Sequence, residues 1–130
     1  MPPPGAAGGA VTVALVLLGA AVGAPLRYVT DLLVQSRHDS VLPWGTLAVN
    51  VAGSLVLGVA AGAMPGHQWA LTLVGTGFCG ALTTFSTFGF ETVRLAQDGW
   101  VKACVANVVL GVGLSLAACA LGWWVAAALV

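Results

Sequence analysis

Apolar residues fill four long stretches of the chain, and polar or turn-forming residues separate them. The stretches cover about residues 10–33, 43–63, 69–95 and 101–127. Pro43 is well placed to open the second stretch as a helix, and the pair Pro65-Gly66 indicates a tight turn before the third. A helix needs about 20 mostly apolar residues to cross a bilayer. The pattern therefore predicts an all-α membrane protein with four transmembrane helices.

The composition supports lipid as the solvent of this chain. Of its 130 residues 59% are apolar and 6% are charged, and the mean hydropathy is +1.01. A soluble domain carries about 25% charged residues, so this chain could not cover a water-facing surface. We expect a single transmembrane domain over residues 10–130, preceded by a Pro/Gly/Ala-rich, disordered tail over residues 1–9.

The charged side chains sum to zero and fall into two clusters. The clusters are Arg27, Asp31, Arg37 and Asp39, and then Glu91, Arg94, Asp98 and Lys102. They form no basic patch of the kind that binds nucleic acid. The cysteines are Cys79, Cys104 and Cys119. None of them has a CxxC spacing and all lie in apolar stretches, so we interpret them as small core residues and not as metal ligands or disulfide partners.

Polar side chains inside the spans are costly in lipid unless they meet a partner or a water-filled path. Two sets recur every four residues, which places each set on one helical face. The sets are Thr46, Asn50 and Ser54 in the second span, and Asn107, Gly111 and Ser115 in the fourth. Both offer hydroxyl or amide donors without charge. They either line a pathway or bond one helix to another.

The third span is a poor continuous helix by composition. It carries Gly75, Gly77 and Gly80, followed by four hydroxyl residues interleaved with Phe85 and Phe88. Irregular backbone at membrane depth is tolerated where it is buried in protein or lines a cavity. We therefore expect a helix broken in mid-membrane, with an unbroken helix whose hydroxyls bond its own carbonyls as the alternative. In helical geometry the two phenylalanines share a face, and their ring edges suit a small anion.

Three segments together resemble a known family, the Fluc/CrcB fluoride channels. Residues 77–88, GFCGALTTFSTF, followed by Glu91, resemble the third-helix signature of these channels. Residues 23–28, GAPLRY, resemble their first-helix element, and residues 45–54, GTLAVNVAGS, their second-helix element. The three segments occur in the family's order over a chain of similar length. The one departure in the third-helix signature is Ala81, where a second glycine is frequent.

The resemblance implies a passive fluoride channel that exports cytoplasmic fluoride from a prokaryotic cell and so limits its toxicity. It implies an antiparallel dimer of four-helix subunits with two pores and, at the dimer centre, a structural Na⁺ that is not transported. Carried onto this chain, the Na⁺ ligands are the main-chain carbonyls of Gly80 and Thr83. The fluoride pore residues are Asn50, Phe85, Phe88, Ser86, Thr87 and, as a weaker match, Ser115. Arg27 would draw anions into a vestibule or pair with Glu91 or Asp31.

The arrangement of basic residues bears on orientation and partner. Arg27, Arg37, Arg94 and Lys102 fall on one side of a four-span topology, and the other side has no Lys or Arg. The positive-inside rule then favours cytoplasmic loops near Arg37 and Asp98, with both termini outside the cell membrane. A fixed orientation would require a homologous partner of opposite orientation, whereas a homodimer would require insertion in both directions.

Other functions place demands that the sequence meets poorly. A small multidrug exporter needs a membrane-embedded carboxylate, for which Glu91 is the candidate. An intramembrane hydrolase needs a nucleophile beside a base, yet His38 and His67 lie in a loop and a turn on opposite sides. A purely structural subunit would leave the hydroxyl-rich third span without a purpose.

Overall fold

A computed structural model describes residues 5–37 and 39–130, and this part of the chain contains helices and no strand. Its elements in order are α1 (Ala6–Arg37), α2 (Trp44–Ala63), α3 (Gln68–Ala70), η1 (Leu71–Cys79), α4 (Gly80–Leu82), α5 (Phe85–Gln97) and α6 (Val101–Leu129). Helices α3 to α5 together make the third span. Four spans within the described residues are long and apolar enough to cross a membrane. The prediction of a four-span, all-helical protein is confirmed.

The first span is longer than expected at both ends. It begins at Ala6 and not near residue 10, and it ends at Arg37 and not near residue 33. The expected disordered tail is therefore helical from Ala6, and its residues 1–4 lie outside the described part. The Thr12 hydroxyl donates to the Gly8 carbonyl at 3.0 Å within this added part of the helix. The bounds of the other three spans differ from those expected by one or two residues, the usual scatter of helix ends.

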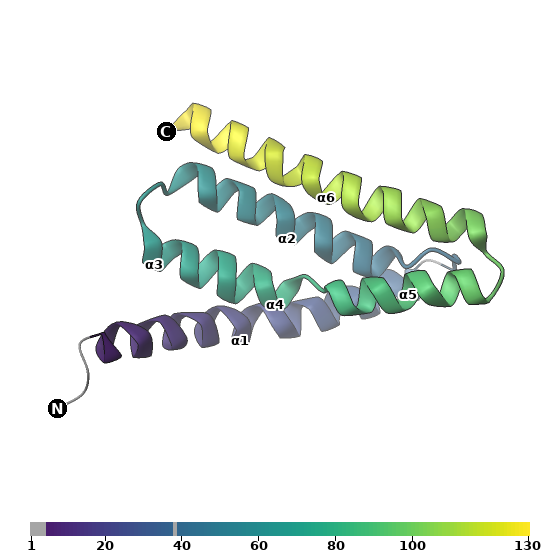
Figure 1. Ribbon diagram of the computed structural model, residues 1–130, viewed down its shortest axis with the longest axis horizontal. Helices are drawn as coiled ribbons and strands as arrows, with labels where there is room; N and C mark the ends of the chain where they lie inside the picture. Colours follow the sequence, from purple (N-terminus) through teal and green to yellow (C-terminus); the bar gives the residue numbers. More distant parts are fainter. Residues whose placement is uncertain (1–4, 38) are drawn as a thin grey trace.

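Small residues let the helices approach closely. Figure 1 shows α2 lying between α6 and the α3–α4 part of the third span, with α1 beyond. A Cβ added at Gly58 would strike the Cys119 carbonyl of α6, and one at Gly122 would lie 2.6 Å from the Leu55 carbonyl of α2. A Cβ added at Gly77 would lie 2.8 Å from the Val16 carbonyl of α1. The in-span glycines thus allow backbone contact between helices, as is typical of membrane bundles.

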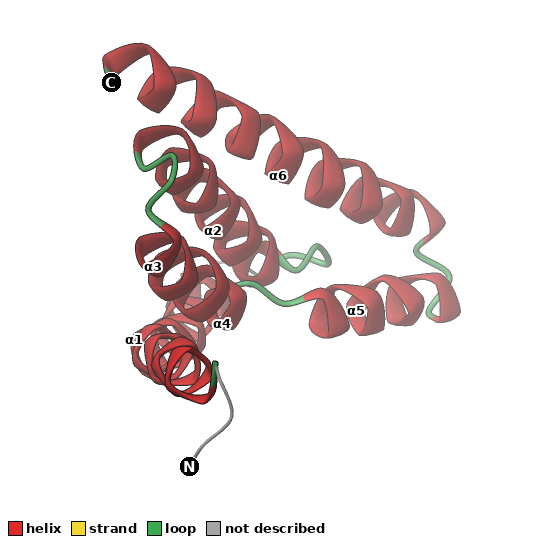
Figure 2. Cartoon of the chain, turned by 60° about the vertical axis from the view of Figure 1, so that its left-hand side comes forward, coloured by secondary structure: helices red, strands yellow, loops and turns green. Residues whose placement is uncertain are grey.

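The third span changes character along its length. Over η1 the backbone forms a wide π-helix. This conformation is rare in proteins, and where it occurs it is often found at functional sites. After α4 the chain leaves helical geometry for two residues and resumes it in α5. In Figure 2 the loop between α4 and α5 is visible, and α5 leads away from α1 and α4 toward the beginning of α6. The third span therefore consists of two half-helices with different neighbours.

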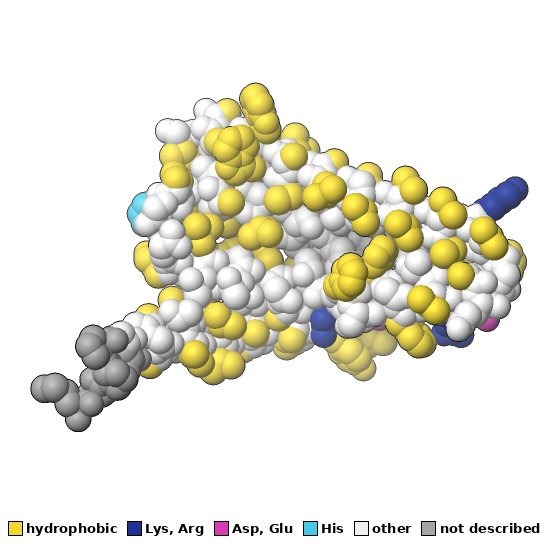
Figure 3. Space-filling model, viewed as in Figure 1, with side chains coloured by type: hydrophobic (Ala, Val, Ile, Leu, Met, Phe, Trp, Pro, Cys, Tyr) yellow, Lys and Arg dark blue, Asp and Glu magenta, His cyan; other side chains and the backbone are white. Residues whose placement is uncertain are grey.

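The surface is apolar over most of its length. In Figure 3 apolar side chains are spread along the whole visible face, and charged side chains are few and lie mainly toward the end where α5 joins α6. Gly66 and Gly99 form the tight turns before α3 and before α6, with φ of 82° and 83° that favour glycine. Cys79 is buried, and all three cysteines are free. An apolar belt with charge at one end is the surface of a multi-pass membrane protein.

Candidate functional site

The break in the third span consists of Thr83 and Thr84, which have extended backbone angles (φ −82°, ψ 158° and φ −146°, ψ 121°). Thr84 caps α5, because its hydroxyl accepts a hydrogen bond from the Thr87 amide at 3.2 Å. In a continuous helix that amide would bond the Thr83 carbonyl. The break therefore releases the Thr83 carbonyl from the helical ladder.

Asn50 holds the break from α2. Its Oδ1 accepts from the Thr84 amide at 2.8 Å, and its Nδ2 donates to the Thr84 carbonyl at 3.0 Å. In a continuous helix the Thr84 amide would bond the Gly80 carbonyl. The side chain of Asn50 thus takes over that amide and leaves the Gly80 carbonyl free of it.

Thr83 is fixed on both sides. Its hydroxyl donates to the Cys79 carbonyl at 2.8 Å, and its carbonyl accepts from Arg27 at 3.4 Å. Its methyl group lies against Gly53 of α2, where a Cβ would collide with it. The position of the break is set by neighbours from α1, α2 and η1 together.

A cavity of about 390 Å³ adjoins the break. Residues from α2, η1, α4, α5 and α6 line it, together with Thr83 of the break. The polar and aromatic members of its lining are Asn50, Ser54, Thr83, Phe85, Phe88 and Ser115. No charged residue lines it, and Gly80 lies at its wall. The cavity therefore brings together most of the residues that the sequence indicated as pore or ion ligands.

The two phenylalanines lie on the same face of α5, as expected from their spacing. Their ring centroids are 5.9 Å apart and the rings are tilted by 45°. Phe85 is 83% exposed in the single chain, whereas Phe88 packs on Gly111 of α6, where a Cβ would lie 2.8 Å from the ring. The Ser115 hydroxyl, one helical turn beyond Gly111, is buried without a hydrogen-bond partner in the described part of the chain.

The remaining predicted residues lie elsewhere. Thr87 and Arg27 line a second cavity of about 160 Å³, which they share with Asp31, Thr46 and Thr84. Ser86 is exposed, and its hydroxyl lies 3.4 Å from that of Thr84. The hydroxyl-rich segment is thus divided between two sides of the break.

Arg27 and Glu91 do not form the ion pair that the sequence left open. Arg27 donates to the Thr83 carbonyl, and Glu91 Oε1 accepts from the Thr46 hydroxyl at 3.1 Å. Within the described part of the chain, the one ion pair is Arg94–Asp98 at 3.8 Å, and both side chains are exposed. Of the alternatives that the sequence left open for Arg27, an ion pair with Glu91 or Asp31 is not seen among the described residues, where the guanidinium donates to the Thr83 carbonyl instead.

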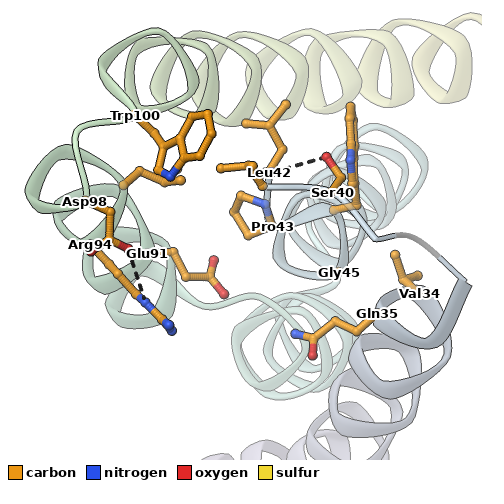
Figure 4. A pocket seen from close by; sticks show the side chains of 13 residues that line it. Val34, Gln35, Ser40, Leu42, Pro43, Gly45, Glu91, Arg94, Asp98 and Trp100 are labelled. Carbon is orange, nitrogen blue, oxygen red and sulfur yellow. Dashed lines mark hydrogen bonds and ion pairs between the residues drawn. The ribbon is translucent and has the colours of Figure 1, made fainter.

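Glu91 lines a third cavity, of about 370 Å³, at the end where α5 joins α6. Figure 4 shows its carboxylate pointing into this space, with Arg94 on the same helix, Asp98 directly after the end of that helix, and Gln35 across from it. Glu91 Oε2 is buried and has no partner within the described residues. This carboxylate is held by α2 at the charged end of the molecule, away from the uncharged cavity.

A protein-family model described as "CrcB-like protein, Camphor Resistance (CrcB)" matches residues 14–123, which includes every element from the middle of α1 to near the end of α6. The chain belongs to the CrcB family. Among its CrcB relatives, a protein of Nocardia farcinica is 56% identical over 85% of this chain and 78% of its own length. One of Frankia casuarinae is 53% identical over 83% and 90%, and one of Streptomyces avermitilis is 52% identical over 88% and 95%.

Each of these three CrcB proteins is named "Fluoride-specific ion channel FluC 1". These names describe the three relatives as ion channels and not as enzymes. The resemblance to the Fluc/CrcB family, inferred from three short segments, is confirmed over most of the chain.

Sequence reasoning missed two residues that shape the CrcB site. Thr84 is both the cap of α5 and the partner of Asn50, and Thr92 links α5 to α6 through Asn107. A signal existed for Thr84, because threonine is a favoured cap immediately before a helix. None existed for Thr92, whose partner lies in another span.

Proposed function

We propose that this chain is a subunit of a fluoride channel that lets cytoplasmic fluoride leave the cell passively and so limits its toxicity. The names of the three relatives support fluoride as the ion. The observation that carries the proposal is the uncharged cavity beside the break, into which Asn50, Phe85, Phe88 and Ser115 converge from three helices.

The chemistry of this cavity suits fluoride. The ion is small and strongly hydrated, so a pore must replace its water with several donors at once. One Nδ2 hydrogen of Asn50 is used by Thr84, which leaves the other, and the unpartnered Ser115 hydroxyl can donate as well. Phenylalanine ring edges add positive electrostatic potential. Without a fixed cation in the lining, binding stays weak enough for the ion to leave.

The main-chain carbonyls of Gly80 and Thr83 fit the structural Na⁺ that the family implies. Both lose their helical amide partners at the break, because Asn50 and the Thr84 hydroxyl take those amides. Oxygen ligands suit a hard cation, and no cluster of three His, Cys, Asp or Glu side chains offers another metal site within the described residues. When bound, the ion supplies a fixed structural charge and is not transported. Arg27 reaches the Thr83 carbonyl at 3.4 Å, which leaves the second lone pair of that oxygen for a further partner.

A second Fluc/CrcB subunit, packed antiparallel, completes the site in this proposal. Phe85 is 83% exposed and Gly80 is exposed, although both belong to the segment around the break. Backbone carbonyls and a cavity wall at membrane depth are unfavourable against lipid unless protein covers them. A second subunit placed on this face would cover both residues and close the pathway.

Orientation and location follow from charge. Arg27, Arg37, Arg94 and Lys102 all belong to one side of the four-span topology, which favours that side in the cytoplasm of a prokaryotic cell. With a fixed orientation, the partner is a homologous chain inserted the opposite way. With insertion in both directions, the channel is a homodimer.

Fluoride efflux from liposomes tests the proposal. Liposomes that contain the purified protein and potassium fluoride are opened to potassium flow with valinomycin, and a fluoride electrode records release. We expect rapid fluoride release, no release of chloride under the same gradient, and none from protein-free liposomes. Equal rates with and without protein would refute the function.

A further inference from the structure

The polar face of α6 contacts α5 at Phe88, one of the two aromatic residues of the cavity. This face was recognised from the four-residue spacing of Asn107, Gly111 and Ser115, and the proposed function uses only Ser115. Asn107 is 4% exposed and Gly111 is buried, so both lie inside the subunit. Their contacts show what the rest of the face does.

Asn107 is the first link of a part-buried hydrogen-bond chain that ends on the backbone of Phe88. Its Nδ2 donates to the Thr92 hydroxyl at 2.9 Å, and that hydroxyl donates to the Phe88 carbonyl at 2.7 Å. A threonine hydroxyl has one proton, which this arrangement commits to Phe88 while a lone pair accepts from Asn107. The chain therefore ties the carbonyl of Phe88 to α6 through two short bonds.

Gly111 holds the other end of the same residue. A Cβ at Gly111 would lie 2.8 Å from Cε2 of the Phe88 ring, so the ring rests directly on the α6 backbone. Gly111 is four residues after Asn107, one turn along the same face. The backbone and the ring of Phe88 are thus fixed by consecutive turns of one helix.

Helix α5 has little other anchorage. Of its 13 residues only Leu95 is buried, and the break before it removes the continuity that would otherwise fix its direction. The Thr46–Glu91 bond ties it to α2, and the Asn107–Thr92 bond is the side-chain hydrogen bond that ties it to α6 within residues 5–37 and 39–130. A half-helix with so little packing takes its position from these polar ties.

We propose that Asn107 and Thr92 are positioning residues for Phe88: they set where its ring stands in the ion pathway without touching the ion. The expected effect on fluoride efflux rests on the proposed function. The expected effect on the position of the ring rests on the hydrogen-bond chain alone. Loss of either link releases the Phe88 carbonyl from α6 and lets the ring leave its seat on Gly111.

The test combines fluoride efflux with a ¹⁹F NMR label on the ring itself. Phe88 is replaced by 4-fluorophenylalanine, whose resonance reports the ring position whether or not the protein conducts. Thr92→Val and Asn107→Leu should each slow fluoride efflux about tenfold and shift or broaden the resonance. The double variant should lose no more than the more affected single variant, because both break one chain.

Two substitutions serve as controls. Thr92→Ser keeps the hydroxyl and should restore both readouts to within about twofold of wild type. Thr72→Val removes a hydroxyl that bonds its own helix at Gln68, 2.8 Å away, and should leave both unchanged. Gly111→Ala keeps the hydrogen-bond chain, displaces only the ring, and should slow efflux with a shifted resonance.

The outcomes separate the two proposals. An unlabelled wild type that passes no fluoride refutes the channel function, while the resonance of the labelled protein still reports the position of the ring. Wild-type efflux and an unchanged resonance in Thr92→Val and Asn107→Leu refute the positioning role. If these variants do not fold, Gly111→Ala provides the test. An unmoved ring with normal efflux in this variant would show that contact with α6 does not position the Phe88 ring, and would refute the proposal.

Discussion

The side chain of Asn50 bonds both main-chain groups of Thr84, which a continuous helix would bond instead. Its amide oxygen accepts from the Thr84 N–H at 2.8 Å, and its amide nitrogen donates to the Thr84 carbonyl at 3.0 Å. The side-chain amide of Asn50 can make both bonds in one orientation only, because its oxygen must face the Thr84 N–H and its nitrogen the Thr84 carbonyl. Both main-chain groups of a residue outside the helices are thereby satisfied in an apolar setting, where an unmet polar group is costly. One side chain of α2 thus maintains the break, and with it the free carbonyl of Gly80.

Asn50→Asp should reduce fluoride efflux at least about tenfold and lower the thermal stability of the purified protein. The substitution removes the Nδ2 donor and directs a carboxylate at the Thr84 carbonyl, so one buried bond is lost and a repulsion is added, together about 1–3 kcal/mol or more. Efflux and the melting temperature in detergent measure the two effects. Asn50→Leu separates them, since it loses both bonds and adds no charge. Wild-type stability in both variants would contradict the role of Asn50 at the break.

Gly53→Ala should destabilise the break by crowding Thr83. The new methyl group collides with the methyl group of Thr83, and overpacking of this kind costs about 1–3 kcal/mol. Thr83→Ser removes that methyl and keeps the hydroxyl that bonds Cys79, so the double variant should recover most of the stability. Gly113→Ala is the matched control, because a Cβ there meets no atom within 4 Å. The melting temperature decides; equal losses in the single and double variants would show that the contact is not responsible.

The sequence predicted the elements more readily than their contacts. Apolar length alone placed the four spans to within a few residues, because lipid thickness constrains each helix independently of its neighbours. The glycines and hydroxyl residues around Thr83 also indicated an unusual segment, because helix propensity depends on the local sequence. The Asn50–Thr84 and Asn107–Thr92 bonds join residues 34 and 15 positions apart. Their pairing depends on how helices face one another, which no local pattern encodes.

The hydrogen-bond partner of Arg27 is a further contact that the sequence did not indicate. In the sequence, the charges of Asp31 and Glu91 made an ion pair one of two alternatives for Arg27. The Thr83 carbonyl was expected to be free at the break, but its hydrogen bond from Arg27, at 3.4 Å, was not foreseen. Glu91 is then left to Thr46. The partner of Arg27 depends on which acceptor lies within reach of its guanidinium, and the charges alone do not indicate that.

Phe88→Ile and Phe85→Ile should affect stability unequally although both slow fluoride efflux. Phe88 fills the seat on Gly111, so its loss leaves a cavity within the subunit that costs about 1–3 kcal/mol. Phe85 is 83% exposed in the single chain, and its ring contributes little to folding of that chain. Denaturation of the solubilised subunit measures the first effect and liposome efflux the second. Equal stability losses would mean that Phe88 does not pack on α6.

Removal of Na⁺ should weaken the assembled channel. If the carbonyls of Gly80 and Thr83 hold the ion, protein purified and reconstituted in N-methylglucamine salts should conduct fluoride more slowly and dissociate more readily, and added Na⁺ should reverse both changes. A cation of different size, such as K⁺, should restore less. Efflux and light scattering across a Na⁺ series provide the measurement. Rates and oligomer mass that are independent of Na⁺ would remove the ion from the proposal.

A reporter fused to the C-terminus should be found on one side of the membrane. All four basic residues lie on the side opposite to the termini, so the positive-inside rule favours a C-terminus outside the cytoplasm. Paired fusions, one active only in the periplasm or cell exterior and one only in the cytoplasm, measure the ratio. Moving the charge, by Arg37→Gln and Lys102→Gln with two lysines added in the Pro65–Gly66 turn, should reverse it. Equal signal from both wild-type fusions would instead indicate insertion in both directions, and the partner in the proposed antiparallel dimer would then be a second copy of this chain.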